Sequence, residues 1–232
     1  MTNSATETGR GFETKEILSE TGFLLVITGP SGTGKDTVTN EVLKHPAIIG
    51  LKFKRLVTCA DRAPRPGEVH GIDYYFVTPK ELDEMSAKGE LVEKPQPTGT
   101  SRKGTPKREF RAILSGEKRL WRIESYLASK VASGSFFDEQ FESGEAKILR
   151  QLTKVICITS PIDQIEGRRK ARDRKNYNPK EYELRDVQDE PNLRILRESA
   201  VFVDNLDGQL EQAVNEVVNQ TLKHHEKIKN KK

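Results

Sequence analysis

One short segment of the sequence combines residue types and spacing that could bind phosphate directly. It reads Gly29-Pro30-Ser31-Gly32-Thr33-Gly34-Lys35-Asp36-Thr37. Glycines let the backbone turn so that successive N–H groups point inward, the lysine can reach the outer phosphates of a nucleotide, and a following helix contributes the positive end of its dipole. The whole segment is therefore a predicted ATP-binding loop, and Lys35 is a predicted catalytic residue.

The surroundings of this loop fit a Walker A motif. The apolar run at residues 23–27 predicts a buried strand before the loop, and a helix is expected from about Lys35 until the His-Pro pair at residues 45–46. The residue after the lysine is usually Ser or Thr, but here it is Asp36, and the hydroxyl follows at Thr37. Asp36 and Thr37 are candidates to hold Mg²⁺, since carboxylate oxygen suits that ion. Alternatively, Asp36 stabilises the helix N-terminus electrostatically.

A second candidate anion site lies in a loop that prolines stiffen, between residues 58 and 77. Arg62 and Arg65 are three residues apart, so that their guanidinium groups could converge on one phosphate. Tyr74 could donate its hydroxyl to the same group. For the arginine pair alone, two solvated side chains in a surface loop would be the ordinary interpretation.

This second segment resembles that of guanylate kinases, which reads roughly S-x-T-T-R-x-x-R-x-G-E-x-x-G-x-x-Y-x-F. The matching residues are Arg62, Arg65, Gly67, Glu68, Gly71, Tyr74 and Phe76, with Thr58 in place of the family's serine. The resemblance implies that Thr58, Arg62, Arg65 and Tyr74 bind GMP and that Arg62 takes part in catalysis. Residues 89–93 are similar to the family's G-E-x-x-E, whose last glutamate accepts hydrogen bonds from guanine. By that resemblance Glu93 reads the base.

The family's next element, Tyr-Tyr-Gly-Ser/Thr, is only partly kept. Residues 102–105 read Arg-Lys-Gly-Thr. Thr105 fits the hydroxyl residue that meets the base, but cations replace both tyrosines. Arg102 or Lys103 could still hold a phosphate, or they could indicate a different acceptor.

A further departure concerns the family's Asp-Ile-Asp strand end, which here reads Arg-Ile-Glu at residues 122–124. By the resemblance, Glu124 takes the place of the second aspartate, which looks toward the acceptor base and the metal. Arg122 has no counterpart in the family.

Eight lysines and arginines lie between Arg168 and Arg185. Such a run is usually a solvated helix face. In the resembling family, however, a small lid at this point carries an Arg-Gly turn and a second arginine eleven residues later. Arg174 and Arg185 keep that interval, although Lys175 stands where glycine is expected. They are the predicted catalytic lid residues, with Arg172 as the substitute in a shifted register.

Apolar runs alternating with helical patterns predict a doubly wound α/β sheet. The resemblance implies a three-layer P-loop NTPase fold with a parallel sheet, an acceptor insertion and a small lid. The expected parts are a disordered tail at 1–20, a core at 21–51 and 116–222, a GMP-binding insertion at 52–115, a lid at 168–186 and a poorly ordered basic tail at 223–232.

The composition limits the classes of binding partner and the compartment that can be expected. The net charge of +4 over 232 residues is too small to imply nucleic-acid binding, and no apolar run approaches the roughly 20 residues of a membrane span. Residues 1–20 lack the apolar centre of a signal peptide. The two cysteines, Cys59 and Cys157, are expected to be buried thiols in a reducing compartment, which favours the cytoplasm. The oligomeric state is not predicted.

The resemblance implies phosphoryl transfer from ATP, with Mg²⁺, to GMP. Two alternatives stay open. The order Gly-Lys-Asp followed by a hydroxyl residue also resembles the loop of ribose 1,5-bisphosphate phosphokinase, a sugar-phosphate kinase. A guanylate-kinase-like binding module without catalysis is the other alternative, although such modules generally have a degraded phosphate loop and a short lid.

Overall fold

The computed structural model describes residues 21–98 and 101–230, so the predicted tail over residues 1–20 lies outside the described part of the chain. A five-stranded sheet forms the core, in the order β2-β7-β1-β8-β9, and every neighbouring pair in it is parallel. Its strands are β1 (Phe23–Thr28), β2 (Lys54–Arg55), β7 (Lys118–Arg122), β8 (Thr153–Thr159) and β9 (Val201–Asp204). The predicted α/β class is confirmed.

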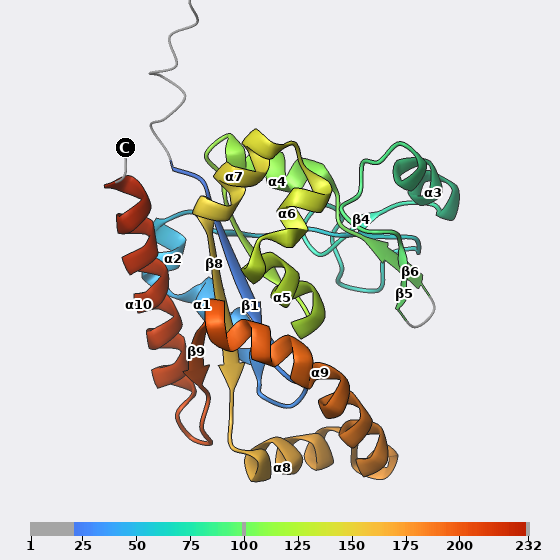
Figure 1. The fold of residues 1–232 in the computed structure, drawn as a ribbon. Helices are drawn as coiled ribbons and strands as arrows, with labels where there is room; N and C mark the ends of the chain where they lie inside the picture. Colours follow the sequence, from blue (N-terminus) through green and yellow to red (C-terminus); the bar gives the residue numbers. More distant parts are fainter. Residues whose placement is uncertain (1–20, 99–100, 231–232) are drawn as a thin grey trace, which may run out of the picture.

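Helices cover both faces of this sheet, which produces three layers (Figure 1). One face packs against α1 (Lys35–Lys44), α2 (Pro46–Gly50) and α10 (Leu210–Lys229). The other face packs against α4 (Lys107–Leu114), α5 (Ser125–Ser133), α6 (Ser135–Gln140), α7 (Ser143–Leu152) and α9 (Pro179–Ser199). Alternate residues of β1 enter the two cores, so its sequence is a continuous apolar run rather than an alternating one.

A smaller four-stranded sheet lies beside the core, in the order β4-β3-β6-β5. It is built from β3 (Cys59–Ala60), β4 (Tyr75–Phe76), β5 (Gln96–Thr98) and β6 (Ser101–Gly104), with α3 (Pro79–Ala87) packed on it. The expected insertion at 52–115 contains this unit but is too wide. Its first strand, β2, joins the core sheet, and α4 buries Phe110 and Ile113 in the main core.

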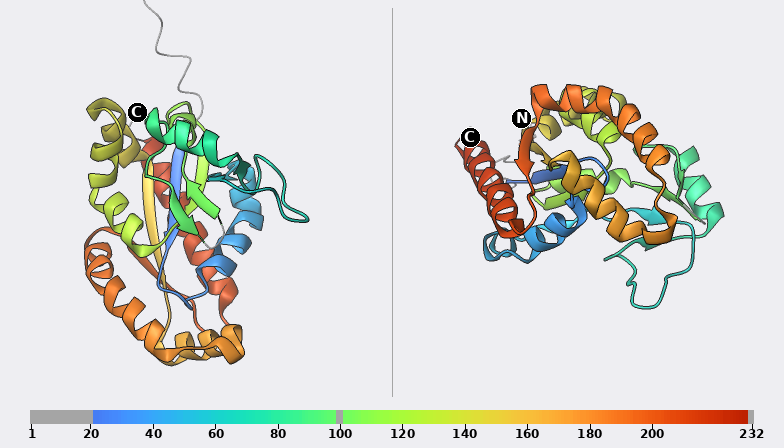
Figure 2. Two further views of the ribbon diagram at one scale, coloured as in Figure 1. Left: turned by 90° about the vertical axis from the view of Figure 1, so that its right-hand side faces the viewer. Right: turned by 90° about the horizontal axis from the view of Figure 1, so that it is seen from below.

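The lid segment consists of α8 (Ile162–Asp173), a 3₁₀ turn at Arg174–Asn176 and the first turns of α9. In Figure 1 the core strands run downward and α8 lies below their carboxyl ends. Figure 2 shows the same end of the molecule from below, with α8 in front of the sheet and the insertion to one side. The carboxyl edge of the sheet is therefore flanked by the lid and by the insertion, as expected for an α/β ligand site.

The expectations for the C-terminal tail and for the two cysteines have different outcomes. The predicted poorly ordered tail from residue 223 is wrong for most of its length, because α10 continues to Lys229 and buries His225 and Ile228. Both cysteines are buried free thiols, as predicted. Burial raises the pKa of Cys59 to about 11 and that of Cys157 to about 12. Within the described ranges, no helix combines the length and apolar character needed to cross a bilayer.

Candidate functional site

The predicted phosphate-binding loop connects β1 to α1 and needs its glycines for two reasons. Gly29, Gly32 and Gly34 all have positive φ, which disfavours other residues. Space is also lacking: a Cβ atom on Gly29 would lie 2.2 Å from the Ile158 carbonyl oxygen, and one on Gly34 would lie 2.4 Å from Asn205 Nδ2. The Asn205 amide donates to the Thr33 carbonyl at 2.8 Å and ties the loop to the end of β9. The loop is therefore held in a preset conformation.

Lys35 begins α1 and is almost completely buried. Its Nζ lies 3.3 Å from Glu124 Oε2, at the carboxyl end of β7. The structure thus brings together the predicted catalytic lysine and the predicted acceptor-side carboxylate, which are 89 positions apart in the sequence. An ammonium group buried beside one carboxylate keeps donors free for a phosphate.

Asp36 forms an ion pair with Arg122, a contact that was not part of either role predicted for it. Its Oδ1 lies 3.0 Å from Arg122 Nε, and Arg122 Nη1 lies 3.6 Å from Glu124 Oε1. One oxygen of the Asp36 carboxylate is thus paired with a cation, so Arg122 competes with Mg²⁺ for this side chain. Thr37, the other predicted ligand, is exposed one position further along α1. Among the described residues, no group of three His, Cys, Asp or Glu side chains could hold a metal ion.

In the acceptor loop, Arg62 is held by a two-pronged ion pair. Its Nη1 and Nη2 donate to the Glu68 carboxylate at 2.6 and 2.7 Å, and the Arg65 backbone N–H donates to the same carboxylate at 2.8 Å. The Arg62 hydrogen bonds, followed by that of the Arg65 backbone, lower the pKa of Glu68 to about 2. Glu68 therefore stays ionised and fixes both the Arg62 side chain and the backbone of the exposed Arg65.

The structure separates the two cations that replace the family's tyrosines. Arg102 is fully engaged: its Nε donates to Asp61 at 2.7 Å and its Nη1 to Asp83 at 2.6 Å. Lys103 Nζ instead lies 2.9 Å from the Tyr74 hydroxyl, and the Arg62 guanidinium is 5.4 Å from the Tyr74 ring centre. Arg62, Tyr74 and Lys103 thus form one cluster, while Arg102 has a structural role.

Glu93 lies beside Thr105 in the insertion. The Thr105 backbone N–H donates to Glu93 Oε1 at 2.7 Å. The other oxygen, Oε2, is buried and has no hydrogen-bond partner in the part of the chain that the structure describes. Burial raises the pKa of this carboxyl group, against the lowering effect of the Thr105 contact. Thr58, the residue before β3, is half-buried, and its carbonyl accepts the Tyr75 N–H at 2.9 Å.

The lid contacts the phosphate loop through arginines that sequence reasoning did not select. Arg169 is 2% exposed, donates to the Ser31 carbonyl at 2.9 Å and pairs with Asp186 of α9. Arg168 donates to the Thr33 carbonyl at 3.3 Å. Helical spacing could have identified both, because Arg168 lies four residues and Arg169 three residues before Arg172, the predicted substitute, and residues at these spacings are neighbours on a helix.

The predicted lid pair lies elsewhere. Arg174 is exposed in the turn after α8, and Arg185 pairs with Glu181 one turn earlier on α9. Neither has a hydrogen bond or ion pair with the phosphate loop within the described ranges. Arg172 does reach it, with Nη2 3.4 Å from Ser31 Oγ. The structure therefore places Arg172, the predicted substitute, against the phosphate loop, and places Arg174 and Arg185 away from it.

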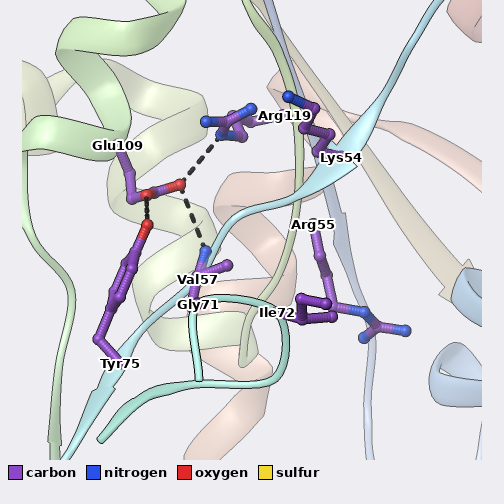
Figure 3. A pocket seen from close by; sticks show the side chains of 8 residues that line it. All are labelled: Lys54, Arg55, Val57, Gly71, Ile72, Tyr75, Glu109 and Arg119. Atoms are coloured by element: carbon purple, nitrogen blue, oxygen red, sulfur yellow. Dashed lines mark hydrogen bonds and ion pairs between the residues drawn. The ribbon is translucent and has the colours of Figure 1, made fainter. Parts of the chain in front are cut away.

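A separate cavity of about 390 Å³ lies where the insertion meets the edge strand β2 (Figure 3). The buried Glu109 carboxylate in its wall accepts hydrogen bonds from Tyr75 Oη at 2.7 Å, Arg119 Nε at 3.0 Å and the Val57 backbone N–H at 3.4 Å. These partners belong to the insertion, to β7 and to the connection between the two sheets. The cluster therefore holds the acceptor loop against the core, and its cations are already partnered.

Comparison with known proteins agrees with this geometry. The family model for guanylate kinase matches residues 22–121. The guanylate kinase of Paramagnetospirillum magneticum is 31% identical over 161 residues, which cover 69% of this chain and 67% of the relative. That of Clostridioides difficile is 39% identical over 111 residues, 47% of this chain and 52% of the relative. That of Streptococcus pyogenes serotype M3 is 43% identical over 76 residues, about a third of each protein.

The matched part of the chain thus spans from about a third to two thirds of the length of these curated relatives. Among solved structures, the crystal structure of guanylate kinase from Anaplasma phagocytophilum superposes with a TM-score of 0.54, covering 90% of this chain and 89% of that one. The two sequences are 20% identical over this superposition, so it establishes the shared fold.

Proposed function

The chain belongs to the guanylate kinase family, and we propose that it transfers the γ-phosphoryl group of ATP to GMP, giving ADP and GDP. The observation that carries the choice of acceptor is the Glu93 carboxylate. One of its oxygens is satisfied by Thr105, and the other is buried without a partner among the described residues. An unpaired buried acceptor costs about 1–3 kcal/mol, which a ligand with matching donors recovers. Guanine offers an N–H and an adjacent amino group to such a carboxylate, whereas adenine does not.

The acceptor phosphate is proposed to bind at the cluster of Arg62, Tyr74 and Lys103, with the exposed Arg65 completing it. Glu68 presents Arg62 in a fixed orientation and leaves part of its guanidinium fork for the ligand. Lys103 supplies the charge where the family has a tyrosine. The neighbouring Glu93 and Thr105 would then hold the base of the same nucleotide.

The donor phosphates are proposed to lie in the loop from Gly29 to Thr37, against Lys35 and the helix N-terminus. An oxygen of the acceptor phosphate forms a bond to the γ-phosphorus while the bond from that phosphorus to the β,γ-bridging oxygen breaks, and its electron pair stays on ADP. Because the attacking oxygen is already anionic, positioning and charge stabilisation supply most of the catalysis. Mg²⁺ would enter as the counterion of ATP, because Asp36 is paired with Arg122.

The cellular setting is proposed to be the cytoplasm. Two buried thiols without a disulfide suit a reducing compartment. Beyond ATP and GMP, neither nucleic acid nor membrane is proposed as a partner.

An acceptor panel tests the function. Turnover with ATP is measured for GMP, dGMP, AMP and ribose 1,5-bisphosphate, and GMP is expected to have the highest kcat/KM. Glu93→Ala should lower the ratio of GMP to AMP turnover by roughly 10²-fold or more, because a site built around a polar group discriminates strongly. Preference for the sugar phosphate would reassign the acceptor. No turnover of any acceptor, together with no affinity for ATP, would support the binding-module alternative.

A further inference from the structure

Two departures from the family pattern meet in one contact. Asp36 stands where phosphate loops usually have Ser or Thr, and Arg122 stands where the family has the first Asp of its strand end. The family model's match ends at residue 121, directly before Arg122. The two unusual side chains form an ion pair at 3.0 Å. An arginine thus replaces the family's aspartate at position 122, and an aspartate pairs with it from position 36.

Stability does not explain this pair. The Asp36 side chain is 69% exposed and that of Arg122 is 37% exposed. Ion pairs in such positions contribute little to folding, because water screens them and ordering two long side chains costs entropy. The pair must therefore be explained by its location.

That location is between the two nucleotide sites. In the sheet order, β7 lies between β1, which leads into the donor loop, and β2, which leads into the acceptor insertion. Arg122 is the last residue of β7, and Ile27 at the end of β1 is its neighbour in the sheet. Glu124, which contacts Arg122, also pairs with Lys35. The Arg122 guanidinium thus stands at the edge where a phosphoryl group would pass from one site to the other.

We propose that Arg122 contacts the phosphoryl group in transit and that Asp36 is its positioning residue rather than a metal ligand. The inference rests on the proposed phosphotransfer. A guanidinium has five N–H donors; the Arg122 Nε contacts Asp36 at 3.0 Å and Nη1 approaches Glu124 only to 3.6 Å, so donors remain for phosphate oxygens. As the bond to the β,γ-bridging oxygen breaks, negative charge on the γ-phosphoryl oxygens and on the leaving oxygen is stabilised by this fixed cation.

The test uses a bisubstrate analogue in which adenosine and guanosine are joined through five phosphates, so that it fills both sites. Arg122→Ala should weaken its binding roughly 10- to 100-fold, measured with and without Mg²⁺, while affinity for GMP alone changes less than about threefold. Arg122→Lys, which keeps the charge but loses the fork, should fall between. Asp36→Ala should give a smaller loss, and the double variant should lose no more than Arg122→Ala alone, because Asp36 acts through Arg122.

Folding is checked by the melting temperature, which should stay within about 2 °C of the original because the pair is exposed. If Arg122→Ala does not fold, Arg122→Gln replaces it. The inference is overturned if Arg122→Ala binds the analogue within twofold of the original chain. It is equally overturned if Asp36→Ala raises the Mg²⁺ concentration needed for binding while Arg122→Ala lowers it, since that pattern belongs to a metal ligand with a competing cation.

Failure of the inference can be told apart from failure of the proposed function. If the original chain phosphorylates GMP and Arg122→Ala does so equally well, only the role of Arg122 is lost. If the original chain instead prefers another acceptor in the panel, the GMP assignment is lost, and Arg122→Ala is then assayed for kcat with that acceptor. A kcat reduced at least tenfold there would still support the role of Arg122, and an unchanged kcat would overturn it.

Discussion

The acceptor side and the donor side of the site differ in how their charges are arranged. On the acceptor side, Arg62 is fixed by Glu68, six residues away in the same loop. On the donor side, the loop is held by partners more than a hundred residues away, with Asn205 and Arg169 donating to its carbonyl groups. The acceptor loop is thus organised by local contacts, whereas the donor loop depends on the tertiary fold. Local contacts leave a readable spacing in the sequence, and distant contacts do not.

The largest effect is expected from a substitution that disrupts the donor side alone. Lys35→Ala should reduce kcat/KM by roughly 10³-fold or more, because a buried cation aimed at the transferred charge is lost. Lys44→Ala is the matched control, since Lys44 lies on the same helix with an exposed side chain and should be neutral. GMP affinity, measured by calorimetry, should be preserved in both variants. A Lys35→Ala enzyme with more than a tenth of the original activity would contradict the donor assignment.

The lid offers the next test, because two registers compete. Arg172→Ala should lower kcat/KM about 10- to 100-fold, since this arginine reaches Ser31. Arg185→Ala should change it less than about twofold, because Arg185 is paired on the exposed face of α9. Steady-state kinetics with saturating GMP distinguishes the two. The reverse order of effects would restore the register in which Arg174 and Arg185 close over the donor.

The acceptor side is tested by substituting the neighbouring residues Arg102 and Lys103. Lys103→Ala should weaken GMP binding roughly tenfold, with the melting temperature unchanged, because a charged contact to phosphate is lost at the surface of the cluster. Arg102→Ala should instead lower the melting temperature by about 2–5 °C, because it removes the side-chain ion-pair partner of the buried Asp61 carboxylate. Calorimetry and thermal unfolding separate the two effects. Equal losses of GMP affinity in both variants would show that both cations hold the phosphate.

The sequence predicts the features that depend on local contacts better than those that depend on distant ones. The β1 strand, the phosphate loop and the start of α1 were all predicted, because a buried strand, positive-φ glycines and a helix N-terminus each have a local signature. Glu93 was predicted only through the resemblance, since nothing in its own neighbourhood marks it. Its unpaired oxygen became visible only when the fold placed Thr105 beside it.

The donor-side contacts could not be predicted in the same way. The pairing of Asp36 with Arg122 joins residues 86 positions apart, and both had been noted separately as departures. The end of α10 was misjudged for a related reason: its lysines suggested a solvated tail, and the buried positions that continue the helical spacing include the polar Thr221 and His225, so the apolar pattern is interrupted before Ile228. In each case tertiary packing, rather than local sequence, decides the outcome.

A more gradual effect is expected from pH, which changes the charge of Glu93, the predicted base reader. Burial raises the pKa of Glu93, and guanine donors require its ionised form. As pH falls through this raised pKa, the ionised fraction falls and the Kd for GMP should rise, by up to about tenfold per pH unit below the pKa. Bound GMP should in turn favour the carboxylate and release a proton, which calorimetry in buffers of different ionisation enthalpy would detect.

The GMP phosphate itself titrates near pH 6, so the matched control is Glu93→Gln measured over the same range. Titration of the phosphate affects both proteins, and the ratio of their Kd values isolates Glu93. The Kd of the glutamine variant divided by the Kd of the original chain should become smaller as the pH falls, because the original chain loses the charge that the glutamine variant never had. A ratio that stays constant between pH 4 and pH 8 would mean that Glu93 does not meet the base as an ionised group, and the acceptor side would lose its predicted base reader.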